Sequence, residues 1–272
     1  MNHSQSASAL RAAALISAVI LTALRVVILK TSFDEAGMLP PGSSALPVTV
    51  AVSACCFLAL LLLALRLNPL PGREDCFSRK PLYLFLGLAS TALLLMGSLL
   101  NLLDPAAVAE TAPLAAALAG ILSALCMGWI ALTQSRSAGL FWLRLPLALS
   151  TGLLLILRFQ DWSHDPMVIH IAPLLLAWTC CMVETMLLTG FPLKAGHRRS
   201  AALFGLAAGC FVCMALPDYF LGLRKALPDL FILLGVALWC VGSALELLRR
   251  PVQDEKAPEA PAAEASAAEN DA

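Results

Sequence analysis

Three ionisable residues of this sequence stand within or at the ends of long apolar stretches, where a charge is costly and marks a candidate site. Arg25 and Arg158 occupy matching places near the ends of two such stretches, and Glu184 lies near the end of a third. Two guanidinium groups facing one cavity could hold an anionic solute, because the guanidinium fork matches carboxylate and phosphate geometry. A lone carboxylate at membrane depth could relay protons or bind a cation. We therefore take Arg25, Arg158 and Glu184 as candidate ligand-binding residues.

Each of these residues also has a structural interpretation. A long Arg side chain one turn from the membrane interface can reach the lipid headgroups. It can instead form a salt bridge, and the acids available to the two arginines are Asp161, Asp165 and Asp218. The Glu184 carboxyl can be neutral, or it can pair with Lys194 or Arg199 near the interface. On sequence grounds both interpretations stay open.

No catalytic signature accompanies these charges. The sequence contains no H-E-x-x-H helix, no G-x-S-x-G turn and no G-x-x-x-x-G-K-[ST] phosphate loop. His164 and His170, together with Asp161 and Asp165, could ligate a divalent cation, but their spacing matches no recognised metal site. Most of the cysteines lie in apolar runs, where Cys packs as a small hydrophobe. We therefore predict no catalytic residue, no metal and no cofactor.

The elements that must position these residues are transmembrane helices. The chain has 272 residues, of which 60% are hydrophobic and only 13% are charged, and its mean hydropathy is +0.83. Several apolar runs reach the roughly 20 residues that a helix needs to cross the hydrocarbon core, and they are too long for barrel strands. We predict an all-α, polytopic transmembrane bundle of about eight helices. The expected spans are 8–29, 46–66, 81–103, 110–133, 139–158, 167–189, 200–220 and 228–248.

The distribution of basic residues predicts the orientation, because Lys and Arg concentrate in cytoplasmic loops. If the N-terminus is inside, the outer positions hold only five of the 18 basic residues: Arg25, Lys30, Arg158, Arg224 and Lys225. We therefore expect a cell-membrane protein with both termini in the cytoplasm. The segment 251–272, rich in Pro, Ala and Glu, is expected to be a disordered acidic tail. A net charge of zero gives no reason to expect nucleic acid as a partner.

The two halves of the chain resemble each other. The segment Leu10–Val27 aligns without gaps on Leu143–Gln160, and Cys55-Cys56 aligns on Cys180-Cys181. We predict a parallel internal repeat, with one four-helix unit at 1–134 and a second at 135–250. Parallel repeats occur in transporters. Chance matches between Leu- and Ala-rich helices are the alternative, and a duplication can also simply build a symmetric scaffold.

The run TSFDEAGMLPPGS (Thr31–Ser43) follows the first predicted helix. With that helix, it resembles uncharacterised multi-spanning integral membrane proteins of gut Firmicutes. The resemblance implies a membrane protein and carries no activity. Read on its own, the run contains turn residues, since Gly37, Pro40, Pro41 and Gly42 fix bends.

Three functions are compatible with these features. The first is a transporter of a small anionic or cationic solute, or of an ion, with its site between the two halves. The second is a non-catalytic membrane scaffold or accessory subunit. The third is a lipid-modifying enzyme without a recognisable motif. All three have the lipid bilayer as a partner, and fold-level analogy alone favours the first.

Overall fold

The computed structural model of the chain describes residues 3–32, 43–67, 71–72, 81–104, 111–133, 140–162, 168–193, 196–221 and 227–249. Residues 33–42 of the predicted outer-loop motif and the predicted tail 251–272 lie outside this part. The outer turn with His164 and Asp165 also lies outside it.

Long helices make up nearly all of the described chain. Their bounds are α1 His3–Thr31, α2 Ala45–Leu65, α3 Pro81–Leu103, α5 Thr111–Thr133, α6 Leu140–Trp162, α7 Val168–Thr189, α8 Arg198–Phe220 and α9 Leu227–Leu247. These eight helices confirm the predicted all-α architecture. They also follow the predicted spans closely, the largest differences being an earlier start of α1 and a later end of α6.

The helices have the length and composition of membrane spans. Seven of the eight described helices hold a window apolar enough to cross a bilayer, and α6 contributes a shorter apolar stretch, Trp142–Leu157. Large hydrophobic side chains such as Leu15, Leu118 and Phe85 point outward from the bundle. Water would not tolerate so much exposed apolar surface, whereas lipid does. The protein is therefore a multi-pass integral membrane protein in contact with the bilayer.

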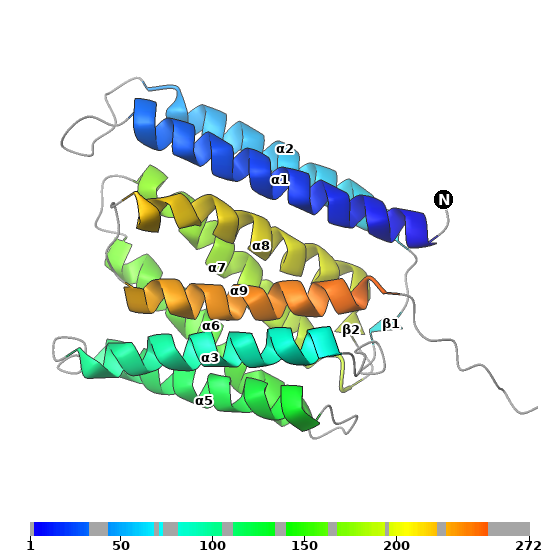
Figure 1. Cartoon of the computed structure of the whole chain (residues 1–272), viewed down its shortest axis with the longest axis vertical. Helices are drawn as coiled ribbons and strands as arrows, with labels where there is room; N and C mark the ends of the chain where they lie inside the picture. The colour runs from blue at the N-terminus through cyan, green and yellow to red at the C-terminus, as the bar shows by residue number, and fades with distance from the viewer. Residues whose placement is uncertain are drawn as a thin grey trace, which may run out of the picture.

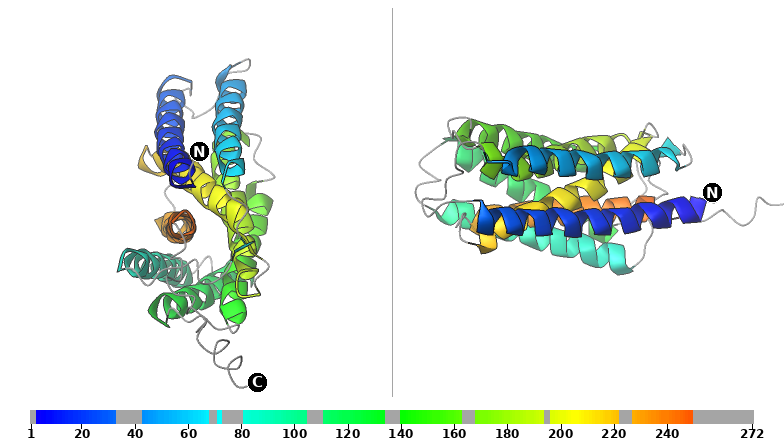
Figure 2. Two further views of the ribbon diagram at one scale, coloured as in Figure 1. Left: turned by 90° about the vertical axis from the view of Figure 1, so that its right-hand side faces the viewer. Right: turned by 90° about the horizontal axis from the view of Figure 1, so that it is seen from above.

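Helices α8 and α9 form the centre of the bundle. Figure 1 shows α1 and α2 side by side at one edge and α3 and α5 at the other, with the remaining helices between them. Helix α8 packs against α1, α2, α7 and α9, and α9 also packs extensively against α3. The view along the helices in Figure 2 shows the same order, with α1 and α2 projecting from the bundle. Accordingly, α8 and α9 bury most of their apolar windows, whereas α1 and α2 leave most of theirs open.

Small residues let the central helices approach closely. A Cβ atom on Gly205 of α8 would lie 2.6 Å from the carbonyl oxygen of Cys240 in α9. A Cβ atom on Gly235 would lie 2.8 Å from the backbone nitrogen of Leu94 in α3. The Ser90 hydroxyl donates to the Gly235 carbonyl oxygen at 2.5 Å. Such backbone contacts are how helices associate in lipid, where no hydrophobic force acts between them.

We call the end of the bundle at which α1 begins the N face, and the other end the opposite face. At the N face, β1 (Pro71–Gly72) pairs antiparallel with β2 (Gly196–His197) and joins the segment after α2 to the segment before α8 (Figure 1). Arg198 then donates from Nε to the Leu247 carbonyl oxygen and from Nη2 to that of Arg249. The last carbonyls of a helix have no intrahelical donor, so this guanidinium closes the end of α9.

The predicted repeat is compatible with part of the packing. Helix α1 packs on α2 and α3 on α5, as α6 packs on α7 and α8 on α9. Helix α1 also packs on α8, across the predicted boundary between residues 134 and 135. Helix contacts do not measure common descent, so the division into two repeated units stays a prediction.

Candidate functional site

Two of the buried ionic groups in the described bundle lie toward its opposite ends. One joins α1 and α8 near the opposite face, and the other lies among α6, α7 and α9 toward the N face. Each contains one of the residues singled out from the sequence, Arg25 in the first and Glu184 in the second.

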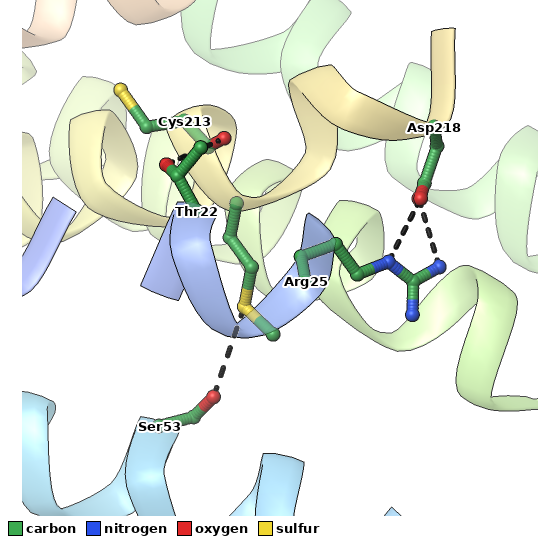
Figure 3. A network of polar contacts seen from close by, with 6 residues as sticks. Thr22, Arg25, Ser53, Cys213 and Asp218 are labelled. Carbon is green, nitrogen blue, oxygen red and sulfur yellow. Dashed lines mark hydrogen bonds and ion pairs between the residues drawn. The ribbon is translucent and has the colours of Figure 1, made fainter. Parts of the chain in front are cut away.

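Arg25 forms a two-pronged ion pair with Asp218 (Figure 3). Its Nε atom lies 2.8 Å from Oδ1 of the carboxylate, and its Nη2 atom lies 3.0 Å from Oδ2. The Arg25 side chain is 0% exposed and the Asp218 side chain is 2% exposed. A buried pair is stable only with such geometry, because each charge has given up its hydration. The structure thus selects Asp218 from the three acids that the sequence offered.

A proline explains a second contact beside the ion pair. Pro217 lies in the last turn of α8 and has no N–H group, so the carbonyl of Cys213, four residues earlier, lacks its usual helical donor. The Thr22 hydroxyl of α1 lies 3.0 Å from that carbonyl oxygen (Figure 3) and 2.7 Å from its own Ala18 carbonyl oxygen, and it shares its one proton between them. In lipid a freed backbone carbonyl must find a donor within the protein.

Further polar contacts attach the first helices to α8. The Cys210 thiol donates to the Ala14 carbonyl oxygen at 3.3 Å, about two turns deeper in the bundle than Thr22. From α2, the Ser53 hydroxyl lies 3.8 Å from the Met214 sulfur. The order of these contacts along α1 and α8 shows that the two helices run parallel. Arg25 is thus part of a continuous helix–helix interface.

The chemistry open to Arg25 follows from this geometry. Two of its guanidinium nitrogens already contact a carboxylate, so an anionic solute would have to displace Asp218. The ion pair also balances its own charge. The observed contact joins α1 to α8, as the salt-bridge interpretation expected, and a ligand-binding role of Arg25 stays a prediction.

Glu184 is placed differently. It lies on α7, five residues before the helix ends at the N face, and it is 0% exposed. Within the described chain, neither carboxyl oxygen makes a hydrogen bond that meets ordinary distance and angle limits. The thiol of Cys240 on α9 lies beside it, and Arg144 on α6 acts on it electrostatically. The cation in range is thus one that the sequence interpretation did not name.

The hydroxyl groups next to Glu184 are already engaged. Thr185 lies 3.0 Å from Thr151 of α6, hydroxyl to hydroxyl, and it also contacts the carbonyl oxygens of Cys181 and Met182 at 2.9 Å. The bond between the two threonines joins α6 to α7. Because the Thr185 hydroxyl is engaged in this way, the neighbouring donor of the Glu184 carboxyl is the Cys240 thiol. A carboxyl in this position can gain or release a proton, or accept a cation that supplies contacts to its oxygens.

The remaining sequence candidates have the following outcomes. Arg158 lies in α6, but its side chain is outside the described residues, so its proposed role stays a prediction. The described residues contain no cluster of His, Cys, Asp or Glu arranged to hold a metal ion. Outside these candidates, Glu246 forms an ion pair with Arg249 at 2.6 Å, near the end of α9.

Sequence reasoning missed two of the residues that complete these groups. Neither Arg144 nor Cys240 was among the candidate ligand-binding residues. A usable signal existed for Arg144, because it lies one turn inside its helix, at the same end of the bundle as Glu184. No feature of the sequence distinguished Cys240, because helix packing determines which side of α9 faces Glu184.

The chain was compared with known proteins at three levels. No protein-family model matches it, and neither does any curated protein or any solved structure. Its function must therefore be argued from the two ionic groups and from the surface of the bundle.

Proposed function

We propose that this protein is a membrane carrier of a small solute or ion, and that Glu184 takes up a proton during its cycle. The single observation behind the proposal is a fully buried carboxyl in a membrane helix whose oxygens make no hydrogen bond of ordinary geometry within the described chain and have the Cys240 thiol as their neighbouring donor. Burying a polar group in this way is expensive. Intramembrane acids are accordingly rare and concentrate on proton and ion pathways.

The neighbours of Glu184 favour a proton over a metal cation. A metal ion would need several oxygen ligands, whereas the interacting groups are a thiol and a guanidinium. The positive charge of Arg144 also repels a metal cation. A proton needs one oxygen and no coordination shell. Arg144 could in turn stabilise the carboxylate after the proton has left.

The proposed site lies within one predicted unit. Glu184, Arg144 and Cys240 all belong to 135–250, whereas the Arg25–Asp218 pair joins this unit to 1–134. We therefore place the carrier site inside the second unit instead of between the two halves. Retaining the basic-residue bias, we also propose that the N face is cytoplasmic and that the protein resides in the cell membrane.

Proton movement in vesicles tests the proposal. Purified protein would be reconstituted into liposomes containing a pH-sensitive dye, and a panel of amino acids, carboxylates, amines and sugars would be added under an imposed pH gradient. We expect at least one class to cause a protein-dependent change of internal pH. Glu184→Gln should abolish that change, because an amide cannot exchange the proton, and Glu184→Asp should retain part of it.

A substrate-independent measurement complements the flux assay. A hydrophobic carbodiimide should modify Glu184, as mapped by mass spectrometry, and should leave the Asp218 carboxylate of the closed ion pair unmodified. Glu246→Gln serves as the control variant, since that acid lies at the end of α9 in a local ion pair. Properly inserted protein that moves no proton with any class, and whose Glu184 resists the reagent, would contradict the carrier proposal.

A second candidate function is a non-catalytic scaffold or accessory subunit. The observation that favours it is the Arg25–Asp218 pair, which is closed and self-balanced. A scaffold needs only a stable bundle and a surface for partners. The flux assay separates the two candidates, since a scaffold would show no response that depends on Glu184.

A further inference from the structure

A groove lies between α2, α7 and α8, apart from both ionic groups. Its volume is about 600 Å³, within the roughly 300–1,000 Å³ of small-molecule sites. Its walls include Val50 and Ala54 of α2, Leu176 of α7, and Phe211 of α8. No charged residue lines it. An occupant must therefore be apolar over the length that it buries.

The hydroxyl groups in the walls are engaged within the protein, and the remaining polar atom among the described lining residues is the Cys180 thiol. Thr49 donates to the Ala45 carbonyl oxygen at 2.6 Å, and Thr179 donates to that of Leu175 at 2.7 Å. Ser53 points its hydroxyl at the Met214 sulfur, 3.8 Å away. None of these protons is left for a ligand. The groove thus offers no directional contact of the kind that a polar solute would require.

The dimensions of the groove match one leaflet of a bilayer. Along α2 its lining runs from Leu46 to Phe57, which at 1.5 Å per residue is about 16 Å, roughly half of the 30 Å hydrocarbon core. The end of the groove that contains Leu46 lies where α2 begins, at the opposite face. At its deep end, the rings of Phe57 and Phe204 lie 6.1 Å apart and tilted by 47°. This aromatic pair closes the groove near mid-membrane.

The groove is continuous with the surface that contacts lipid. Val50 and Leu176 in its walls are exposed, and Val48, Leu58 and Leu62 continue the apolar surface of α2 beyond it. Helix α2 packs less extensively on α8 than α1 does. Figure 2 shows α2 projecting from the bundle at this edge. The bilayer is therefore the phase that adjoins the groove along its open side.

We propose that the groove binds one acyl chain of a phospholipid from the leaflet at the opposite face, with the chain end against Phe57 and Phe204 and the ester end near Leu46 and Thr49. The bound chain fills the space between α2 and the α7–α8 pair, and it supplies the packing that α2 otherwise lacks. The inference is independent of the carrier proposal, since none of the residues around Glu184 takes part.

Photoactivatable phospholipids test this arrangement. The full chain, in liposomes of phosphatidylcholine, would be irradiated with two probes that carry a diazirine either at the chain terminus or beside the ester. The terminal probe should crosslink around Phe57 and Phe204, and the ester-side probe around Leu46 and Thr49. Labelling that is the same for both probes, or no stronger than on the lipid-exposed Leu118, Leu122 and Leu125 of α5, would show ordinary annular lipid and overturn the proposal.

A pair of matched variants sharpens the result. Ala54→Trp places an indole in the groove, and Ala51→Trp places the same group on an exposed position of α2 that does not line it. Ala54→Trp should reduce groove crosslinking about tenfold, the effect of displacing roughly two buried methylene groups. Ala51→Trp should leave it unchanged. Equal effects of the two variants would contradict the proposal.

A measurement on the unmodified protein covers the case in which Ala54→Trp fails to fold. After detergent purification, native mass spectrometry should find one phospholipid retained per chain, and its removal should lower the thermal stability of the protein. Re-adding phosphatidylcholine should restore that stability. Retention of a free fatty acid alone, contacts between two copies of the chain across the groove, or no lipid dependence at all would each overturn the proposed occupant.

Discussion

Two buried acids of this bundle, Asp218 and Glu184, differ in how many contacts their carboxyl oxygens make. Both carboxyl oxygens of Asp218 contact Arg25, at 2.8 and 3.0 Å. Glu184 is equally buried, yet neither of its oxygens makes a hydrogen bond of ordinary geometry within the described chain. Burial alone therefore does not identify a functional acid. The contacts that the carboxyl oxygens make distinguish the two cases. A carboxyl paired on both oxygens joins two helices, whereas a carboxyl without such a partner is a candidate proton site.

The difference originates in the helices that carry the two residues. Asp218 follows Pro217 in the last turn of α8, beside a parallel helix that presents a guanidinium at the same depth. Glu184 faces α9 at Cys240, and a thiol is only a weak donor. The acid of the first group meets a matched partner on a neighbouring helix, and the acid of the second does not.

The largest expected effect is loss of the closed ion pair. Asp218→Asn should destabilise the protein by about 3–5 kcal/mol, because it leaves the Arg25 charge buried without compensation. Unfolding in mixed micelles would measure the loss. Arg25→Leu combined with Asp218→Leu should recover most of it. If Asp218→Asn lowered the stability by less than roughly 1 kcal/mol, the proposed difference between Asp218 and Glu184 would be wrong.

The second effect concerns the N face, where Glu184 lies. Arg198→Ala should cost about 1–3 kcal/mol, since it removes charged hydrogen bonds to the Leu247 and Arg249 carbonyls. Arg198→Lys should recover only part, because a single ammonium cannot reproduce the fork. The same unfolding assay applies. Full recovery by lysine would show that the positive charge at this position stabilises the end of α9, and that two separate guanidinium hydrogen bonds are not required.

Glu184→Gln should change the stability by less than about 1 kcal/mol, because the amide has a similar shape and can lose only a weak contact with the Cys240 thiol. The same carboxyl-to-amide change is thus expected to be severe at Asp218 and mild at Glu184. Proton movement should show the reverse sensitivity at Glu184. A severe loss of stability in Glu184→Gln would mean that the carboxyl has a structural partner after all.

The smallest expected effect is at Thr22. Thr22→Val should cost about 0.6 kcal/mol, the average for a hydrogen bond between membrane helices, since the Cys213 carbonyl loses its donor. A double-mutant cycle with Asp218→Asn measures whether the two contacts act together. Strong coupling would show that they form a single fastening, and additivity would show two independent contacts.

Most of the fold was predictable from the sequence because apolar run length is decisive in lipid. The predicted span 81–103 coincides with α3, and 110–133 differs from α5 by one residue. The largest misses were at α1, which extends five residues earlier, and at α6, which continues to Trp162. Polar residues such as Gln5 and Gln160 hide the ends of a helix from hydropathy, although the backbone continues through them.

The site was less predictable because its contacts cross between helices. On sequence grounds three acids were possible partners of Arg25. The lengths of the apolar runs could not rank them, since they determine neither the order of the helices nor their rotation. The basic residue near Glu184 proved to be Arg144, 40 positions earlier, and not a neighbour in the chain. What the sequence did identify was the rarity of Arg25 and Glu184 at membrane depth.

The distance along the chain between Arg25 and Asp218 bears on how the protein is made. The two residues are 193 positions apart, so at about 5–20 residues per second a ribosome adds the acid roughly 10–40 seconds after the arginine. During that interval the first helix is already at the membrane without its counter-charge. Meanwhile lipid headgroups can solvate the guanidinium, because a long Arg side chain near the interface reaches them. The contact between Arg25 and Asp218 can therefore form only after α8 has been synthesised.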